Sequence, residues 1–179
     1  MIRCVKTSFK TGSDNLDRLF QCYRLSAQMW NECLSMSKAF TLSHGGKWIG
    51  KSQLQEELKG KYPMHSQSIQ AVAHKYLFAR DAAYKSNQKG YKNKYPWRRK
   101  ENFNTKWVDK AFRIEGGNLY LSMRIENGKK RTPIKLKIAK LPSYPINEIE
   151  LIYDRKLSLA FPMMMASNLQ KIIIPINAQ

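Results

Sequence analysis

The fold of this chain changes character within residues 89–107, KGYKNKYPWRRKENFNTKW. Before this stretch, apolar residues recur every three or four positions, as they do along one face of an amphipathic helix. After it, they recur at every second position, as they do in a half-buried strand. The stretch itself places lysines, arginines and aromatic residues around Pro96, with Glu101 as its one acid. We therefore predict helices on its N-terminal side, strands on its C-terminal side and a basic connection between them.

Two helices are predicted in the first 60 residues of the N-terminal side. The first follows a turn and cap at residues 12–14 and ends near Phe40. The second covers residues 52–59, because Ser52 and Gln55 fit a capping box and a glycine follows the segment.

A third helix is predicted to start at a cap provided by Ser66 or Ser68 and to end at Gly90, which suits a C-cap. Its apolar residues recur at helical spacing. The buried face is predicted to consist of Ile69, Val72, Ala73, Tyr76, Leu77, Ala83 and Tyr84.

Strands are predicted at both ends of the chain. The first covers residues 2–10. On the C-terminal side, one hairpin turns at residues 116–117, with a second arm over residues 119–125. A further strand covers residues 134–138, and a second hairpin turns at residues 154–156.

These elements predict an α+β fold, a small antiparallel β-barrel of the OB-like kind or a curled sheet, with an inserted helical lobe. Residues 1–10 are expected to form the first strand of the barrel and residues 11–92 the helical lobe. Residues 93–161 are expected to complete the barrel. Residues 162–179 no longer fit the preceding pattern.

The charge of the chain favours a polyanionic partner. It has 32 basic and 13 acidic residues, a net charge of +19 and a pI near 10.0. Nucleic acid is the usual partner of a folded chain with such a charge. We expect no membrane partner, because no apolar run has the length of a membrane span. The N-terminus lacks the apolar core of a signal peptide, so we expect a cytoplasmic, nucleoid-associated protein.

The basic residues concentrate between Lys85 and Lys110, where nine cations stand against two acids. Cations neutralise phosphates and release bound counterions. The strand predicted over residues 134–138 carries two further lysines on one face. The residues predicted to bind the nucleic-acid backbone are Lys85, Lys89, Lys92, Lys94, Arg98, Arg99, Lys100, Lys106, Lys135 and Lys137.

Aromatic and polar side chains next to these cations have two interpretations each. Tyr95 and Trp97 either stack on unpaired bases or, with Trp107, fill a seam between two lobes. A second set lies at helical spacing and either reads base edges or caps a helix and faces water. The candidates for base reading are Ser66, Gln67, Gln70 and His74.

Neither a metal site nor a catalytic site is predicted. The three cysteines form no CxxC pair, and the histidines have no cysteine partners at zinc-ligand spacing. Cys22 and Cys33 fall on one helical face and are predicted to be buried thiols. Paired carboxylates, phosphate loops and nucleophile arrangements are also missing from the pattern. The sequence therefore favours a binding protein.

Residues 68–100, SIQAVAHKYLFARDAAYKSNQKGYKNKYPWRRK, resemble a region of the transposon-encoded OrfB/TnpB proteins. These are compact RNA-guided nucleases related to type V CRISPR effectors. Their Gly-Tyr-Pro-Arg-Phe-Lys-like motif has its counterpart here in Lys-Tyr-Pro-Trp-Arg-Arg-Lys, residues 94–100. The segments KWVDKAFRIEGGNLYLSMR and PIKLKI are similar to the β segment of the family. The resemblance covers about residues 1–161.

The resemblance implies a wedge barrel and a recognition lobe that bind a transposon-derived guide RNA and a target DNA beside a short adjacent motif. It implies that residues around Ser66 and Gln70 read this motif. It also implies that Lys75 and residues 89–100 hold the nucleic-acid backbone.

The chain departs from the family pattern after residue 161. Family members continue into a RuvC-like nuclease domain that opens with a Gly-Ile-Asp-Leu-Gly type strand, and they usually carry a cysteine zinc module. Neither is present in this sequence. We therefore expect no catalytic residues and no cofactor in this chain, and we expect magnesium only with the RuvC-like domain.

Residues 162–179, PMMMASNLQKIIIPINAQ, are interpreted as a frame-shifted tail. Methionine has one codon, so the run Met163-Met164-Met165-Ala166 encodes Asp-Asp-Gly in the neighbouring frame, which is typical of a turn. Poor packing is then expected for residues 169–176. The alternative is a genuine short strand at residues 172–174.

Three functions fit the sequence. The first is a nucleic-acid-binding N-terminal part of a transposase-related RNA-guided DNA endonuclease, inactive alone. The second is a subunit of a split nuclease whose catalytic half is a separate chain. The third is a stand-alone basic regulator that binds RNA or the DNA ends of the transposon.

Overall fold

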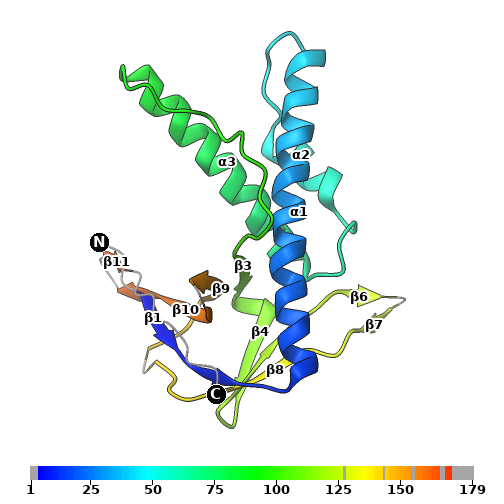
Figure 1. Cartoon of the computed structure of the whole chain (residues 1–179), viewed down its shortest axis with the longest axis vertical. Coiled ribbons are helices and arrows are strands. Elements are labelled where there is room, and N and C mark those ends of the chain that lie inside the picture. Colours follow the sequence, from blue (N-terminus) through cyan, green and yellow to red (C-terminus); the bar gives the residue numbers. More distant parts are fainter. Residues whose placement is uncertain (1–3, 127, 143, 155, 166–167, 171–179) are drawn as a thin grey trace.

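The computed structural model describes residues 4–126, 128–142, 144–154, 156–165 and 168–170. Within them the chain has the predicted α+β fold. The helices are α1 (Ser13–Ser43), α2 (Lys51–Leu58) and α3 (Ser66–Gln88), and a short 3-10 turn, η1, covers Asp109–Ala111. Figure 1 shows α1 and α3 as two arms that rise from a base of strands, with α2 beside α1.

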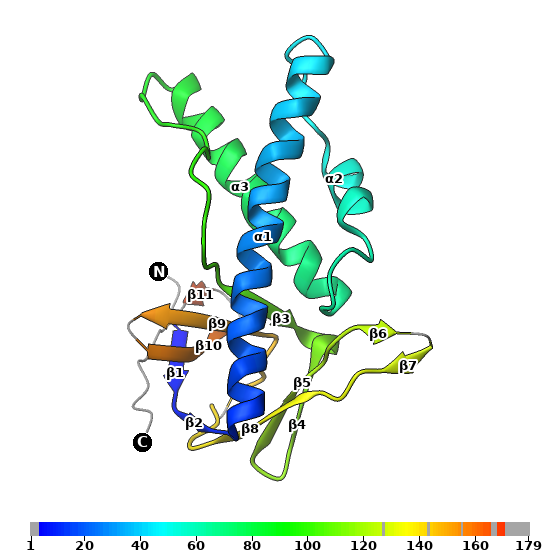
Figure 2. The ribbon, with the colours of Figure 1, turned by 45° about the vertical axis from the view of Figure 1, so that its right-hand side comes forward.

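The described strands form three antiparallel sheets. The first has the order β1-β10-β9-β3, with β11 also paired to β10, and the second has the order β2-β8-β5-β4. A separate hairpin, β6-β7, projects from the base in Figure 2. The bounds are β1 Cys4–Thr7, β2 Phe9–Lys10, β3 Thr105–Val108, β4 Phe112–Glu115, β5 Asn118–Leu121, β6 Ile125–Glu126, β7 Lys129–Lys130, β8 Ile134–Ile138, β9 Glu148–Asp154, β10 Lys156–Met165 and β11 Asn168–Gln170.

The sheets do not join into one closed barrel within the described residues. The predicted single strand over residues 2–10 is instead two strands that part at Ser8, so that β1 pairs with β10 and β2 pairs with β8. Two hydrogen bonds to residues 139 and 140, which directly follow β8, hold this corner. The Thr7 hydroxyl donates to the carbonyl of Lys140 at 2.8 Å, and the Ala139 amide donates to the carbonyl of Ser8 at 3.1 Å. The N-terminal segment therefore links two sheets rather than completing one.

All three helices lie between β2 and β3 in the chain, so the helical lobe is an insertion between strands, as predicted. The predicted apolar face of α3 is buried except for Tyr84, which is exposed because it lies near the end of the arm. Trp30 of α1 joins the arms, with its ring 5.5 Å from Tyr76 and 4.7 Å from Phe103. Trp107 is fully buried and donates its indole N–H to the carbonyl of Ser122 at 3.2 Å.

The turn and cap predicted at residues 12–14 include the N-cap of α1, whereas the caps predicted for α2 and α3 were wrong. The N-cap of α1 is Gly12 and that of α2 is Gly50, neither with a side-chain hydrogen bond. The Ser52–Gln55 capping box does not form, because α2 starts at Lys51 and Ser52 is already its second residue; the Gln55 amide instead lies 2.7 Å from Nε2 of His74.

The N-cap of α3 is His65, whose Nδ1 accepts a hydrogen bond from the Gln67 amide at 3.3 Å. Ser66 is the first residue of α3, and Ser68 is the third and is fully buried. An imidazole nitrogen therefore takes the role that was predicted for a hydroxyl.

The C-terminal end of α3 agrees with the prediction. Gly90 has a φ of +87°, and the amides of Gly90 and Tyr91 donate to the carbonyls of Asn87 and Ser86 at 3.0 and 3.2 Å. This pair of bonds is a Schellman motif, which requires a left-handed residue after the helix. It reverses the chain, so that residues 91–100 return along the helical arms (Figure 2).

Two strand predictions need correction. The arm predicted over residues 119–125 ends as β5 at Leu121, and Met123 forms an isolated bridge with Met64 instead. The strand β3 was missed, although its Thr-Lys-Trp-Val sequence alternates, because it directly follows the basic stretch. The alternation predicted for residues 134–138 is confirmed, with the three apolar residues buried and both lysines exposed.

The tail predicted from Pro162 is described only in part. The backbone of β10 continues to Met165, and β11 pairs with it through Met163–Gln170, Met164–Leu169 and Met165–Asn168. The packing predicted for residues 169–176 and the strand predicted at 172–174 lie outside the described residues or side chains.

Candidate nucleic-acid interface

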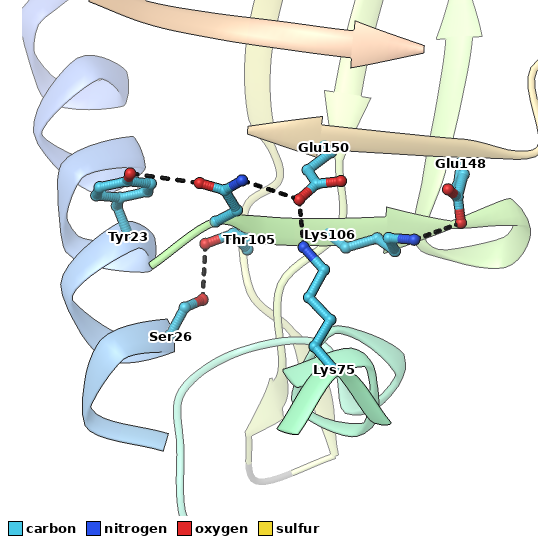
Figure 3. Close-up of polar contacts among 8 residues, drawn as sticks. Tyr23, Ser26, Lys75, Thr105, Lys106, Glu148 and Glu150 are labelled. Atoms are coloured by element: carbon cyan, nitrogen blue, oxygen red, sulfur yellow. Dashed lines mark hydrogen bonds and ion pairs between the residues drawn. The ribbon is translucent and has the colours of Figure 1, made fainter. Parts of the chain in front are cut away.

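Two lysines tie α3 and β3 to the neighbouring strand β9. Lys75 forms an ion pair with Glu150, whose side chain is 8% exposed, and Lys106 forms one with Glu148 at 2.7 Å. Asn104 also donates to Glu150 at 3.0 Å. Figure 3 shows Lys75 reaching up from its helix to Glu150, across β3. Both predicted phosphate-binding lysines are thus engaged within the chain, and their role toward phosphate stays a prediction.

A second set of bonds fixes the same corner to α1. The Ser26 and Thr105 hydroxyls lie 2.8 Å apart and both are buried, and the Thr105 hydroxyl donates to the carbonyl of Cys22 at 3.0 Å. Tyr23 donates to Asn104 at 3.3 Å. The strand that follows the basic stretch is therefore held by both helical arms (Figure 3).

A groove of about 420 Å³ opens between α3 and the β3-β9 edge. Lys106 on the sheet wall pairs with Glu148, and Lys75 on the helix wall pairs with Glu150, so the groove carries little net charge. The helix wall also contributes amide and imidazole groups. Such neutral donors and acceptors suit the edges of bases better than phosphates. The lining residues are Gln67, Gln70, Ala71, His74, Lys75, Phe78, Lys106, Val108 and Glu148.

Three of the four candidate base-reading residues line this groove. Gln70 is exposed, and Oε1 of Gln67 is buried with no hydrogen-bond partner among the described residues. His74 is held by Gln55, and burial, followed by the charge of Lys51, lowers its pKa below 6.5, so the ring favours its neutral form. The fourth candidate, Ser66, is exposed at the start of α3 and does not line the groove.

Most of the predicted backbone-binding cations lie on the surface. Lys135 and Lys137 are exposed on β8, and Lys135 sits 5.7 Å from the ring of Tyr120. On the arm and the return segment, none of the exposed cations has a carboxylate within ion-pair distance among the described residues. These arm and segment cations are Lys85, Lys89, Lys92, Lys94, Arg98 and Arg99.

Asn31 of α1 clips the return segment in place. Its amide donates to the carbonyl of Lys100 and accepts from the Lys100 amide, both at 2.8 Å. The Lys100 ammonium lies 4.5 Å from the rings of Trp30 and Phe103, and burial lowers its pKa below 10.5. The C-terminal end of the basic segment is therefore anchored, and Lys100 is the least available of its cations.

The predicted stacking residues lie in the seam between α1 and α3 and yet remain accessible. Tyr95 is 40% exposed and Trp97 is 53% exposed. They line a seam between two helices rather than the predicted seam between the two lobes, and their stacking on bases stays a prediction. Trp107 belongs to neither role, because it is part of the core.

Several surface features were missed by the sequence reasoning. Phe78 is 77% exposed beside the α3 groove, and its position off the apolar face was the available signal. A second cationic hollow of about 400 Å³ lies between the α3 N-terminus and the second sheet. Its cations, Lys110, Arg113, Lys130 and Arg131, come together only in the folded sheet.

The thiols and acids offer no further site within the described residues. Cys22 and Cys33 are fully buried as predicted, and burial raises the pKa of each to about 12. No group of three or more His, Cys, Asp or Glu side chains is placed to hold a metal ion in the part of the chain that the structure describes. None of the described helices has the length and apolar character needed to cross a membrane.

Comparison with known protein families found no family that matches this chain. Comparison with curated proteins likewise found no match.

Proposed function

We propose that this chain binds nucleic acid as the wedge and recognition part of an RNA-guided nuclease of the OrfB/TnpB type. The supporting observation is the run of exposed cations from Lys85 to Arg99, which lies on an anchored segment and faces no carboxylate among the described residues. Such cations attract phosphates, because neutralising a phosphate releases counterions.

In this proposal the α3 groove and the basic segment bind different nucleic acids. The α3 groove, with its amides and imidazole, reads base edges of the target DNA, and the basic segment holds the backbone of the guide RNA. The two larger sheets together correspond to the OB-like wedge, with Ser8 as the corner where the chain passes between them. The chain contributes binding, and the cleavage step with its magnesium belongs to the RuvC-like half of such a nuclease.

The experiment is to purify the full chain from cells and sequence the nucleic acid that stays with it. We expect one structured RNA to be enriched over total RNA. A segment variant, Lys92, Lys94, Arg98 and Arg99 each changed to Gln, should retain at least tenfold less of it. The matched control variant changes Lys10, Arg24, Lys47 and Lys129 to Gln, which removes the same charge from other exposed positions.

The other possible outcomes contradict the proposal or favour one of its alternatives. Retention of heterogeneous RNA by both variants at the wild-type level contradicts the proposal. Preference for duplex ends over structured RNA favours a stand-alone regulator. A second chain that co-purifies and carries the RuvC-like acids identifies a split nuclease.

A further inference from the structure

A second groove, on the opposite side of α3 from the first, has no role in the function proposed above. It lies between α1 and α3 and has a volume of about 490 Å³. Helical geometry separates the two grooves, because positions 76 and 80 face away from positions 74 and 78. The lining is mostly apolar and aromatic, and comprises Leu34, Ser37, Lys38, Thr41, Leu42, Trp48, Tyr76, Arg80, Tyr95, Pro96 and Trp97.

The aromatic rings of this groove are held in fixed positions while their faces remain accessible. Trp48 contacts Tyr84 and Tyr95 edge-on, at centroid distances of 5.1 and 5.5 Å. Arg80 lies 4.8 Å from the Trp48 ring and is itself fixed by the Ile49 carbonyl at 2.9 Å. A ring that is already immobile loses little freedom when a flat partner stacks on it.

Cations border these rings on both sides. Tyr95, Pro96 and Trp97 also line a neighbouring hollow of about 310 Å³, whose other residues include Lys94, Arg98 and Lys100. Lys38 and Arg80 line the groove itself, and neither hollow has a carboxylate in its lining. Asp81 pairs with Nε of Arg80 at 2.9 Å and so helps to fix the guanidinium beside the Trp48 ring.

We propose that this groove binds the unpaired bases of a single-stranded nucleic acid. Its bases stack on Trp48, Tyr95 and Trp97, and its phosphates lie against Lys38, Lys94 and Arg98. Alternating flat rings and cations is the arrangement by which sequence-tolerant single-strand sites work. The rings, more than the charge, distinguish the occupant, because an acidic peptide would meet the cations but its backbone and carboxylates would supply no flat groups to stack on Trp48, Tyr95 and Trp97.

The test compares a base-containing strand with a strand of equal charge. The full chain is titrated with a dye-labelled oligothymidylate and with an abasic sugar-phosphate strand of the same length. We expect the abasic strand to bind about tenfold more weakly, because base stacking on aromatic side chains contributes that order of affinity. The difference should shrink in the Trp48→Leu and Trp97→Leu double variant, which keeps only Tyr95 of the three rings, and should be unchanged in Phe78→Leu, which removes an exposed ring from the other groove.

The outcomes separate this inference from the function proposed above. Equal binding of the two strands by the wild-type chain overturns the inference alone, since the backbone contacts would still operate. Failure to bind either strand or any duplex overturns both. An unchanged preference in the double variant, with its melting temperature preserved, also overturns the inference and leaves the groove to another occupant such as an acidic peptide. The comparison of strands on the wild-type chain needs no variant to fold.

Discussion

Among single residues, Glu150 links β9 to α3 and to the residue that precedes β3. It lies on β9, accepts from Lys75 of α3 and from Asn104 before β3, and is 6% exposed. A nearly buried carboxylate needs such partners, because removal of one side of the pair leaves the other without compensation. This side chain therefore helps to hold α3 and β3, the two walls of the α3 groove, against β9.

We predict that Glu150→Ala lowers the free energy of unfolding by about 3 kcal/mol. The loss arises because a desolvated ammonium and an amide each lose their acceptor. Urea denaturation monitored by far-UV circular dichroism measures it. The control is Glu101→Ala, which removes an exposed acid and should cost less than about 0.5 kcal/mol. Equal losses in the two variants would contradict this account of the pair.

His65 is the residue that makes the start of α3 sensitive to pH. Burial lowers its pKa below the ordinary 6.5, and its neutral Nδ1 caps the helix. The folded state thus binds its proton less readily than the unfolded state. Stability from this group is fully present above about pH 6.5 and is lost as pH falls from there through the lowered pKa.

We predict that His65→Asn removes the share of the acid-induced loss that comes from this cap, because the Asn side chain accepts the bond at every pH. At pH 7.5, His65→Ala should cost about 1 kcal/mol while His65→Asn stays near wild type. Unfolding curves at pH 7.5 and 5.0 make the comparison. An Asn variant that loses as much stability on acidification as wild type would show that the cap does not titrate.

Among the elements, the return segment over residues 91–100 is held at both ends. The Schellman motif at Gly90 starts it, and the paired bonds of Asn31 to Lys100 end it. Asn87 and Asn93 add local bonds near the turn, and the backbone amide of Asn93 donates to Oδ1 of Asn87 at 2.7 Å. The cations are therefore displayed on a defined path rather than on a loose linker.

We predict that Asn31→Ala lowers the free energy of unfolding by about 1–2 kcal/mol and speeds tryptic cleavage at Arg98 and Arg99. Both effects follow from loss of the clip at Lys100. Timed digestion followed by mass spectrometry identifies the cleavage sites. Gln28→Ala, at an exposed position of α1, is the control. Cleavage rates that match in the two variants would indicate that the clip does not order the segment.

Sequence periodicity was sufficient for the helical insertion, the apolar face of α3 and the strand over residues 134–138, because each has one face in a core. Caps and strand ends were not predictable in the same way. His65 takes the cap of α3 because tertiary packing buries its ring, and β5 ends at Leu121 because Met123 pairs with Met64 far away in the chain.

The candidate site was likewise predictable from the sequence only in part. The basic segment is continuous in sequence and was found there, whereas the groove needs α3 to lie against β3. The pairing of Lys75 with Glu150 and the gathering of Trp48 with Tyr95 both depend on contacts between distant residues. No local pattern carries that information.

In the whole molecule, a net charge of +19 is distributed over two helical arms and a base of sheets. The described acids that form ion pairs neutralise some of the cations near the base, such as Lys75, Lys106 and Arg131. The exposed cations from Lys85 at the end of the α3 arm to Arg99 on its return segment face no carboxylate among the described residues. We predict that this run of cations, more than the total charge, determines binding to nucleic acid.

The most direct test is the salt dependence of duplex DNA binding, measured by fluorescence anisotropy for wild type and for the two quadruple Gln variants described above. The slope of log Kobs against log salt falls by about 0.9 for each phosphate contact removed. We predict that the segment variant loses about 3 from this slope and that the control variant loses less than about 1. Equal slopes for the two variants would contradict the assignment of the basic segment as the phosphate-binding surface.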